Sequence, residues 1–172
     1  MKEHIIETPR CYIREIEEGD IAAELELYDS PHMTDFIDPP EEYEDEVILC
    51  RLYADKVYGQ YGYGMWGIFD RATDELIGEA GLEPRFDVDR QEYPYDWMFE
   101  RSSAELGFFI AERLWGQGFC TEACNEILTC CKDRFGITTV FARAQDDNVA
   151  SVRVLEKLGF SEMENNLYIK RF

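Results

Sequence analysis

A mixed α/β (α+β) fold is predicted for this chain of 172 residues. Apolar residues make up 45% of the sequence, which is enough for a packed core, and the length fits one domain over residues 1–172. Strand and helix patterns alternate only in the second half of the chain. The sheet should therefore mix parallel and antiparallel strands between flanking helices.

The first half opens with a short strand and two helices. Cys11–Ile16 reads as the strand, and Asp20 is placed to cap a helix over Ile21–Tyr28. A proline pair then opens a second helix over Glu41–Tyr58, whose first turns carry five carboxylates. Carboxylates at this end oppose the positive end of the helix dipole, so the acidic run has a structural reason.

The middle of the chain predicts a hairpin and a long connection. Met65–Phe69 and Glu75–Leu82 read as strands joined by a turn at Asp70–Asp74. The connection Pro84–Ser103 is long enough to be a functional loop or an interface element. Four aromatic residues in it are expected to cover a bound ligand or to seal a homodimer: Tyr93, Tyr95, Trp97 and Phe99.

The second half alternates strands and helices. Its predicted elements are a strand over Ala104–Ala111, a helix over Thr121–Phe135 ended by Gly136, a strand over Thr138–Ala144, a helix over Asn148–Leu158 ended by Gly159, and a hairpin of Phe160–Glu164 and Leu167–Arg171.

The charge of the chain restricts its partners. Lys and Arg total 17 against 37 Asp and Glu, which gives a net charge of −20. Nucleic acid is not expected as a partner, because phosphate binding depends on clustered basic residues. Residues 1–46 hold 16 acidic and 3 basic side chains, a net of −13. This excess favours cationic small molecules or basic peptides, although general solubility is an equal alternative.

No membrane partner and no metal are expected. No apolar run approaches the roughly 18 residues that span a bilayer, and Met1–Glu7 lacks a secretory apolar stretch, so a cytoplasmic protein is predicted. The six cysteines include no C-x-x-C pair, and the two histidines lie far from them. Cys120, Cys124 and Cys131 fall on one helical face, which predicts buried free thiols.

A glycine-bearing turn is the most informative feature for function. Gly116 and Gly118 leave backbone N–H groups uncovered just before a helix N-terminus, and this arrangement can hold a pyrophosphate. Arg113 could add a fixed positive charge. A P-loop is excluded because no Gly-Lys-Ser or Gly-Lys-Thr follows the turn. A Rossmann fingerprint is excluded because Thr121 stands at its third glycine.

A second motif makes the turn more specific. Arg113-x-x-Gly116-x-Gly118 is followed, one strand and one helix later, by Asn148-Val-Ala-Ser151 and then Leu-Gly-Phe. Together they resemble the GNAT superfamily of acetyl-CoA-dependent N-acetyltransferases, and the resemblance runs from about Thr8 to Met163. The Thr-Glu-Ala helix start and the Asn-x-x-Ser motif are most similar to the ribosomal-protein N-terminal acetyltransferase branch. That branch also contains enzymes acting on other amines.

The resemblance implies a mostly antiparallel sheet, splayed where the coenzyme enters, and acetyl-CoA as co-substrate without a metal. Asn148 would bond the pantetheine arm, and Ser151 would face the coenzyme sulfur. A backbone N–H of Phe109 or a neighbour would hold the thioester oxygen as negative charge develops. The implied coenzyme contacts are Phe108, Phe109 and Ile110 beside the pantetheine, Arg113, Leu114, Trp115, Gly116, Gln117, Gly118 and Phe119 around the pyrophosphate, and Cys120 and Thr121 at the helix start.

The predicted reaction is direct attack of a primary amine on the acetyl group. An alkylamine is largely protonated at neutral pH, so it must first lose a proton. Glu105 is the candidate base, directly or through water, and its alternative role is an outward-facing or ion-paired carboxylate. Many family members carry Tyr where this chain has Leu155. Ser151 is the substitute expected as general acid, with simple helix packing as its alternative.

Two other functions stay open from the sequence. Because Leu155 replaces the family's Tyr, the chain could be an acyl-CoA-binding module without turnover. The glycine turn could instead serve a protein that binds ATP or NAD. Acetyl transfer ranks above both, and the acidic first helices favour a cationic amine or a basic peptide terminus as acceptor.

Overall fold

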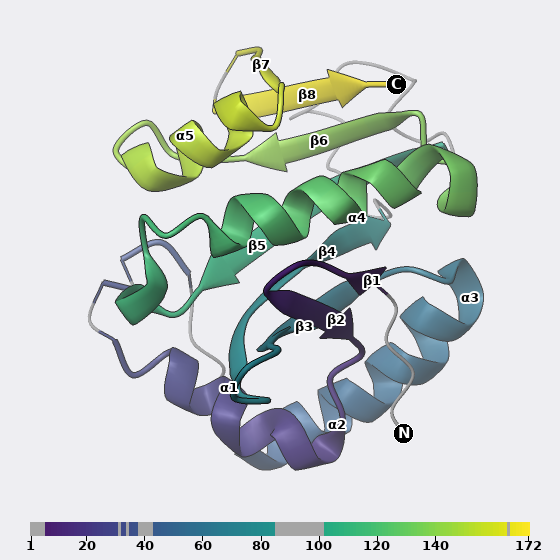
Figure 1. The fold of residues 1–172 in the computed structure, drawn as a ribbon. Helices are drawn as coiled ribbons and strands as arrows, with labels where there is room; N and C mark the ends of the chain where they lie inside the picture. The colour runs from purple at the N-terminus through teal and green to yellow at the C-terminus, as the bar shows by residue number, and fades with distance from the viewer. Residues whose placement is uncertain (1–5, 31, 34, 38–42, 85–101, 165) are drawn as a thin grey trace.

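The computed structural model describes residues 6–30, 32–33, 35–37, 43–84, 102–164 and 166–172, and the account below concerns these residues. Within them, eight strands form one sheet in the order β1-β2-β3-β4-β5-β6-β8-β7 (Figure 1). The described neighbours pair antiparallel except β5 and β6, which run parallel. The prediction of a mixed, mostly antiparallel sheet flanked by helices is confirmed.

The elements follow the predicted order. The strands are β1 (Ile6–Glu7), β2 (Cys11–Arg14), β3 (Met65–Asp70), β4 (Leu76–Pro84), β5 (Ser103–Ile110), β6 (Thr139–Arg143), β7 (Ser161–Glu162) and β8 (Leu167–Arg171). The helical segments are η1 (Glu18–Asp20), α1 (Ile21–Leu27), α2 (Tyr43–Tyr53), η2 (Ala54–Tyr58), α3 (Gly59–Tyr61), η4 (Glu112–Leu114), α4 (Phe119–Phe135) and α5 (Val149–Lys157).

Three sequence predictions need correction. The two-residue strand β1 was missed, because so short a segment has no periodicity. The predicted single helix through Tyr58 changes to a π-helical turn at η2. Asp20 does not cap α1 with its side chain. Its carboxylate instead accepts hydrogen bonds from the Arg14 guanidinium at 2.6 and 2.8 Å and from the Glu17 N–H at 2.9 Å.

Two of the predicted segments lie wholly or partly outside the described residues. The predicted acidic helix lacks its first two residues in the described ranges. Most of the connection Pro84–Ser103, including its four aromatic residues, also lies outside them.

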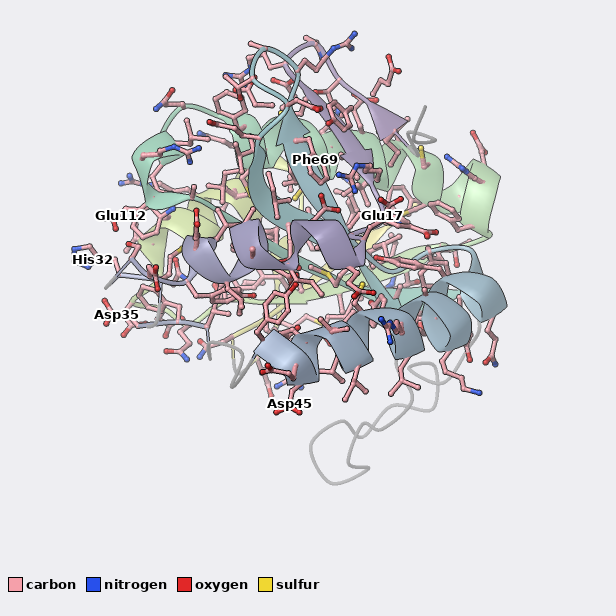
Figure 2. The ribbon with its side chains drawn as sticks, turned by 90° about the horizontal axis from the view of Figure 1, so that it is seen from below. Glu17, His32, Asp35, Asp45, Phe69 and Glu112 are labelled. Carbon is pink, nitrogen blue, oxygen red and sulfur yellow. The ribbon has the colours of Figure 1, made fainter. Side chains whose placement is uncertain are left out.

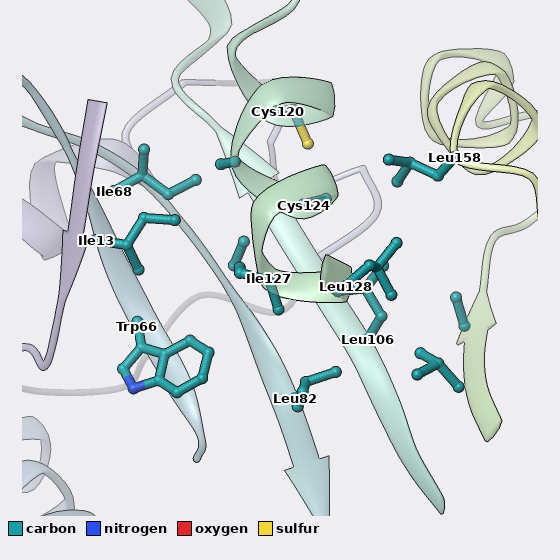
Figure 3. Packing of buried hydrophobic residues seen from close by; sticks show 14 of the residues in the cluster. Ile13, Trp66, Ile68, Leu82, Leu106, Cys120, Cys124, Ile127, Leu128 and Leu158 are labelled. Atoms are coloured by element: carbon teal, nitrogen blue, oxygen red, sulfur yellow. The ribbon is translucent and has the colours of Figure 1, made fainter. Parts of the chain in front are cut away.

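The main core lies between the sheet and α4. Residues of α4 such as Ile127 pack against Ile13, Trp66 and Leu106 from three different strands (Figure 3). Cys120, Cys124 and Cys131 are buried on this face, and all six cysteines are free thiols, as predicted. Burial raises the pKa of the Cys131 thiol to about 12, so it is unreactive at neutral pH.

The opposite face of the sheet is covered by α1 and α2, which lie side by side (Figure 2). A smaller core cluster forms there, in which Tyr12 stacks on Phe69 with ring centroids 5.2 Å apart and Leu27 of α1 packs nearby. Of the helices in the described ranges, none combines the length and apolar character needed to span a bilayer. The two faces therefore carry different helices, and this division sets the two sides of the site.

Candidate active site

The sheet splits between β5 and β6. Their parallel pairing covers only Ser103–Glu105 against Thr139–Phe141. Beyond it, β5 continues to Ile110 with only β4 paired to it, while β6 continues to Arg143 paired with β8. The far half of β5 therefore has a backbone edge with no described strand beside it, as the resemblance implied.

The register of β4 and β5 shows which amides face this edge. The Ala111 N–H donates to the Ile77 carbonyl at 2.8 Å, so these two residues form a hydrogen-bonded pair across the strands. Backbone groups alternate along a strand, and the pairing continues without interruption. The N–H of Phe109 therefore points to β4. The N–H groups that face the open edge are those of Phe108 and Ile110, the two neighbours of Phe109.

The glycine turn has the geometry that the sequence predicted. Gly116 and Gly118 adopt φ angles of 73° and 82°, in the left-handed region that side chains disfavour. Gly118 is the N-cap of α4, and the turn is exposed. The unpaired N–H groups of the first turn of α4, a 17-residue helix, thus begin directly after a glycine turn.

A second cation, Arg10, lies at the turn in addition to the predicted Arg113, and its Nε forms an ion pair with Glu122 Oε2 at 2.6 Å. Arg113 Nη2 lies 3.2 Å from Glu75 Oε2, on the exposed side of the β3–β4 turn. Arg10 stacks on the Phe119 ring, with its guanidinium carbon 4.1 Å from the ring centroid. Its Nη1 donates to the Gln117 carbonyl at 2.9 Å, inside the turn. Arg10 was not predicted, because no local pattern in the sequence links residue 10 to residue 117.

Asn148 and Ser151 lie together at the start of α5. The Ser151 N–H donates to Asn148 Oδ1 at 3.1 Å, which makes Asn148 the N-cap of the helix. Its side-chain amide N–H groups are not used by that bond, so they are left for a ligand. Leu155 is fully buried in the core with α4, so the position where the family carries Tyr is a packing position here.

Glu105 lies on the other face of the sheet. Side chains alternate along β5, and Leu106 and Phe108 pack with the α4 cluster while Phe109 packs with α1. Glu105 shares the α1 face with Phe109, and its Oε1 lies 3.6 Å from Arg143 Nε. The side chain of Glu105 is 26% exposed. The candidate base and the candidate acid, Ser151, are thus carried on opposite faces of the sheet.

A group of carboxyls on the α1 face was not predicted as a site. Glu79 of β4 is 7% exposed, and it shares a hydrogen bond with Glu24 of α1. Burial, then the charge of Glu46, raises the pKa of Glu24 to about 7, and burial raises the pKa of Glu79 well above its usual range. The sequence does contain a signal for this group, because Glu79 is the one carboxylate within the otherwise apolar strand Leu-Ile-Gly-Glu-Ala-Gly-Leu.

Comparisons with known proteins agree with this architecture. The acetyltransferase (GNAT) domain model matches residues 10–161. An uncharacterized N-acetyltransferase of Bacillus subtilis, YoaA, is 27% identical over 160 residues, which cover 92% of this chain and 83% of YoaA.

Two solved structures share the fold. A ribosomal-protein-S5-alanine acetyltransferase of Vibrio fischeri superposes with a TM-score of 0.77 at 14% identity, over 96% of this chain and 95% of that one. An aminoglycoside acetyltransferase, AAC(6′)-Ib, solved with coenzyme A, gives a TM-score of 0.73 at 15% identity, over 94% of each chain. Identities this low show the fold alone. With the family model matched across most of its length, the chain belongs to the acetyltransferase (GNAT) domain family.

Proposed function

We propose that the protein is an N-acetyltransferase that uses acetyl-CoA to acetylate a primary amine by direct attack. The observation that carries the proposal is the join between the open edge of β5 and the glycine turn at the start of α4. The edge supplies amides for an extended arm, and the turn supplies amides for an anion, within one continuous stretch of chain. A molecule with a net charge of −20 needs such local donors to hold an anionic coenzyme.

The coenzyme contacts proposed here follow from that stretch. The backbone of the turn between Arg113 and Phe119 holds the pyrophosphate, helped by Cys120 and Thr121 in the first turn of α4. Phe108 and Ile110 offer their outward backbone groups to the pantetheine, and the Asn148 amide reaches it from α5. No group of metal-ligating side chains is assembled in the described parts of the chain.

The transfer step uses both faces of the sheet. The amine loses a proton, its nitrogen forms a bond to the acetyl carbon, and the carbon–sulfur bond breaks. The Phe108 N–H donates to the oxygen that gains negative charge. Glu105 accepts the amine proton, and Ser151 donates a hydrogen bond to the departing thiolate. Glu105 precedes Phe108 by three residues, about 10 Å along a strand, so the proton passes through water.

The acceptor proposed is a small cationic amine or a basic protein N-terminus. The acidic character of α1 and α2 supports a cation, and the structural neighbour from Vibrio fischeri is named for a ribosomal protein substrate. Cytoplasmic location and a homodimer remain predictions from the sequence.

The test is a thiol-release screen with acetyl-CoA against amino acids, polyamines, aminoglycosides and basic peptides, run beside calorimetric titration with coenzyme A. We expect coenzyme A to bind, and thiol to be released with at least one class of cationic amine. Binding without thiol release across the panel would favour the rival, an acyl-CoA-binding module, for which the buried Leu155 is the supporting observation. A thermal shift with ATP or NAD but none with coenzyme A would overturn both.

A further inference from the structure

A buried carboxyl pair on the α1 face has no counter-ion in the part of the chain that the structure describes. Glu24 and Glu79 share a hydrogen bond, and burial, with a further contribution from Glu46 of α2, raises the pKa of both. Among the described residues, no Lys, Arg or His forms an ion pair with any of these three carboxyls, whereas Glu105 has Arg143 and Asp20 has Arg14. Buried carboxylates without a cation are costly, so their retention calls for a reason.

An unpaired oxygen atom of Glu79 indicates what that reason is. Glu79 Oε1 is buried and has no hydrogen-bond partner among the described residues. The other carboxyl oxygen is available for the bond shared with Glu24. Buried acceptors are paired in nearly all proteins, and an orphan in a functional region indicates a partner that arrives with a ligand. The partner of a carboxyl oxygen must be a hydrogen-bond donor, and beside an anionic pair a cationic donor is favoured.

The pair lies next to the proposed reaction centre. Glu79 and Phe109 are partners across β4 and β5, so their side chains share the α1 face with Cα atoms roughly 5.5 Å apart. The Phe109 ring packs on Tyr28, the C-cap residue of α1, with centroids 5.2 Å apart, and burial, followed by the charges of Glu79 and Glu24, raises the pKa of the Tyr28 hydroxyl. Phe109 directly follows Phe108, whose N–H faces the open edge.

We propose that the Glu24–Glu79 carboxyl pair is the acceptor-binding site for a primary ammonium group, held on the α1 face beside Phe109. The inference rests on the proposed acetyl transfer and names the group that selects its acceptor. Glu79 Oε1 and the Glu24 carboxylate accept N–H bonds from the ammonium, and Tyr28 and Phe109 form an aromatic wall for it. Glu105 lies four residues from Phe109, about 13 Å along the strand, and keeps the separate role of proton acceptor.

The probe is 1,4-diaminobutane, titrated by calorimetry into the protein saturated with coenzyme A and, separately, into the free protein. Its neutral isostere 1,4-butanediol is titrated in parallel. Glu24→Gln and Glu79→Gln keep the size of each side chain and remove its charge. Glu26→Gln, an exposed position two residues along α1, is the matched control. Each variant is also melted to verify that it folds.

We expect the wild-type protein and Glu26→Gln to bind the diamine and not the diol. Glu24→Gln and Glu79→Gln should weaken diamine binding at least 10-fold while melting no lower than the wild type, because each replaces a carboxyl whose ionisation is costly in the interior by a neutral amide of the same size. Binding to the wild type in two buffers of different ionisation enthalpy should also show release of the shared proton, which a structural pair would not show.

Several outcomes would overturn the inference. If coenzyme A binds but the diamine does not, or if it binds equally to all four proteins, the pair is not an ammonium site and the proposed function stands. If coenzyme A fails to bind while the diamine still depends on Glu24 and Glu79, the pair is a cation site and acetyl transfer is wrong. If Glu79→Gln lowers kcat in thiol release with unchanged KM for the amine, the pair is the base rather than the binding site.

Discussion

The two faces of the sheet contribute different chemical groups to the site. On the α4 face, the open edge of β5 and the glycine turn offer backbone amides, so their chemistry is fixed by chain direction and by two left-handed glycines. On the α1 face, the chemistry lies in side chains, namely Glu24, Glu79 and Glu105. Backbone donors suit a ligand that many enzymes share, whereas side chains can change with the acceptor.

The largest expected effect is on the α1 face. Glu105→Gln should lower kcat about 100-fold and remove the limb of the pH–rate profile that reports the base, because the amine proton loses its acceptor. KM for acetyl-CoA should not change. Glu126→Gln, a partly exposed carboxylate on α4 away from the α1 face, is the control. Steady-state thiol release over a range of pH measures this, and an unchanged profile would leave Glu105 as the ion-pair partner of Arg143 alone.

Substitution of two glycines tests whether the turn on the α4 face binds coenzyme A through its backbone amides. Gly118 and Gly136 stand at opposite ends of α4, with φ angles of 82° and 69° and room for a side chain. Valine at either position should cost about 1–2 kcal/mol of stability through backbone strain. Only Gly118→Val should also weaken coenzyme A binding, by roughly 30- to 100-fold or about 2–3 kcal/mol, as seen by calorimetry. Equal losses at both positions would show that the turn acts through stability and not through its amides.

The pH dependence of stability tests the acidic pair. A pKa of about 7 for Glu24 in the folded protein, against 4.5 as its ordinary value, means that the folded state binds more protons. The stability from this group is therefore complete below about pH 4.5 and is lost as the pH rises through 7.

Glu24→Gln should remove about 2 kcal/mol of the fall in unfolding free energy between pH 5 and pH 8, after allowance for the partial exposure of Glu24. Urea unfolding at the two pH values measures this. The difference between the wild type and Glu24→Gln removes the pH dependence that both proteins share through repulsion among the other carboxyls. Glu26→Gln shows how much the loss of an exposed carboxyl changes the unfolding free energy. The groups facing the pair are Glu46, Cys50, Glu83, Asp20, Tyr28, Tyr53 and Tyr58. Parallel curves for the wild type and Glu24→Gln would show that Glu24 ionises normally.

The smallest expected effect is at Ser151. Ser151→Ala should lower kcat by about 3- to 10-fold, because the departing thiolate loses one hydrogen bond. The helix start should survive, since the bond to Asn148 uses the Ser151 backbone N–H. Thiol release against amine concentration measures this, and full turnover would make Ser151 a packing residue on the coenzyme side.

The same division explains what the sequence could predict. The glycine turn, the start of α4 and the cap at Asn148 depend on neighbours in the chain, so motif and cap rules found them. The partner of Glu79 lies 55 residues away on α1, and a second cation of the turn comes from residue 10. Such contacts, including that of the additional cation Arg10 with the turn, depend on the register of the sheet and on helix docking, which local patterns do not specify. The choice between the Phe108 and Phe109 amides likewise needed the observed pairing of β4 with β5.

The contact between the beginning of the chain and the glycine turn bears on how the protein folds. Glu122, in the first turn of α4, accepts hydrogen bonds from the Thr8 hydroxyl at 2.6 Å and from Arg10 Nε at 2.6 Å. These residues are separated by more than 100 positions, so the contact closes only after most of the chain has been made and collapsed. During synthesis the glycine turn and the start of α4 should therefore gain their contacts with Thr8 and Arg10 only after α4 has been made, so residues 8–10 must stay available until that helix docks.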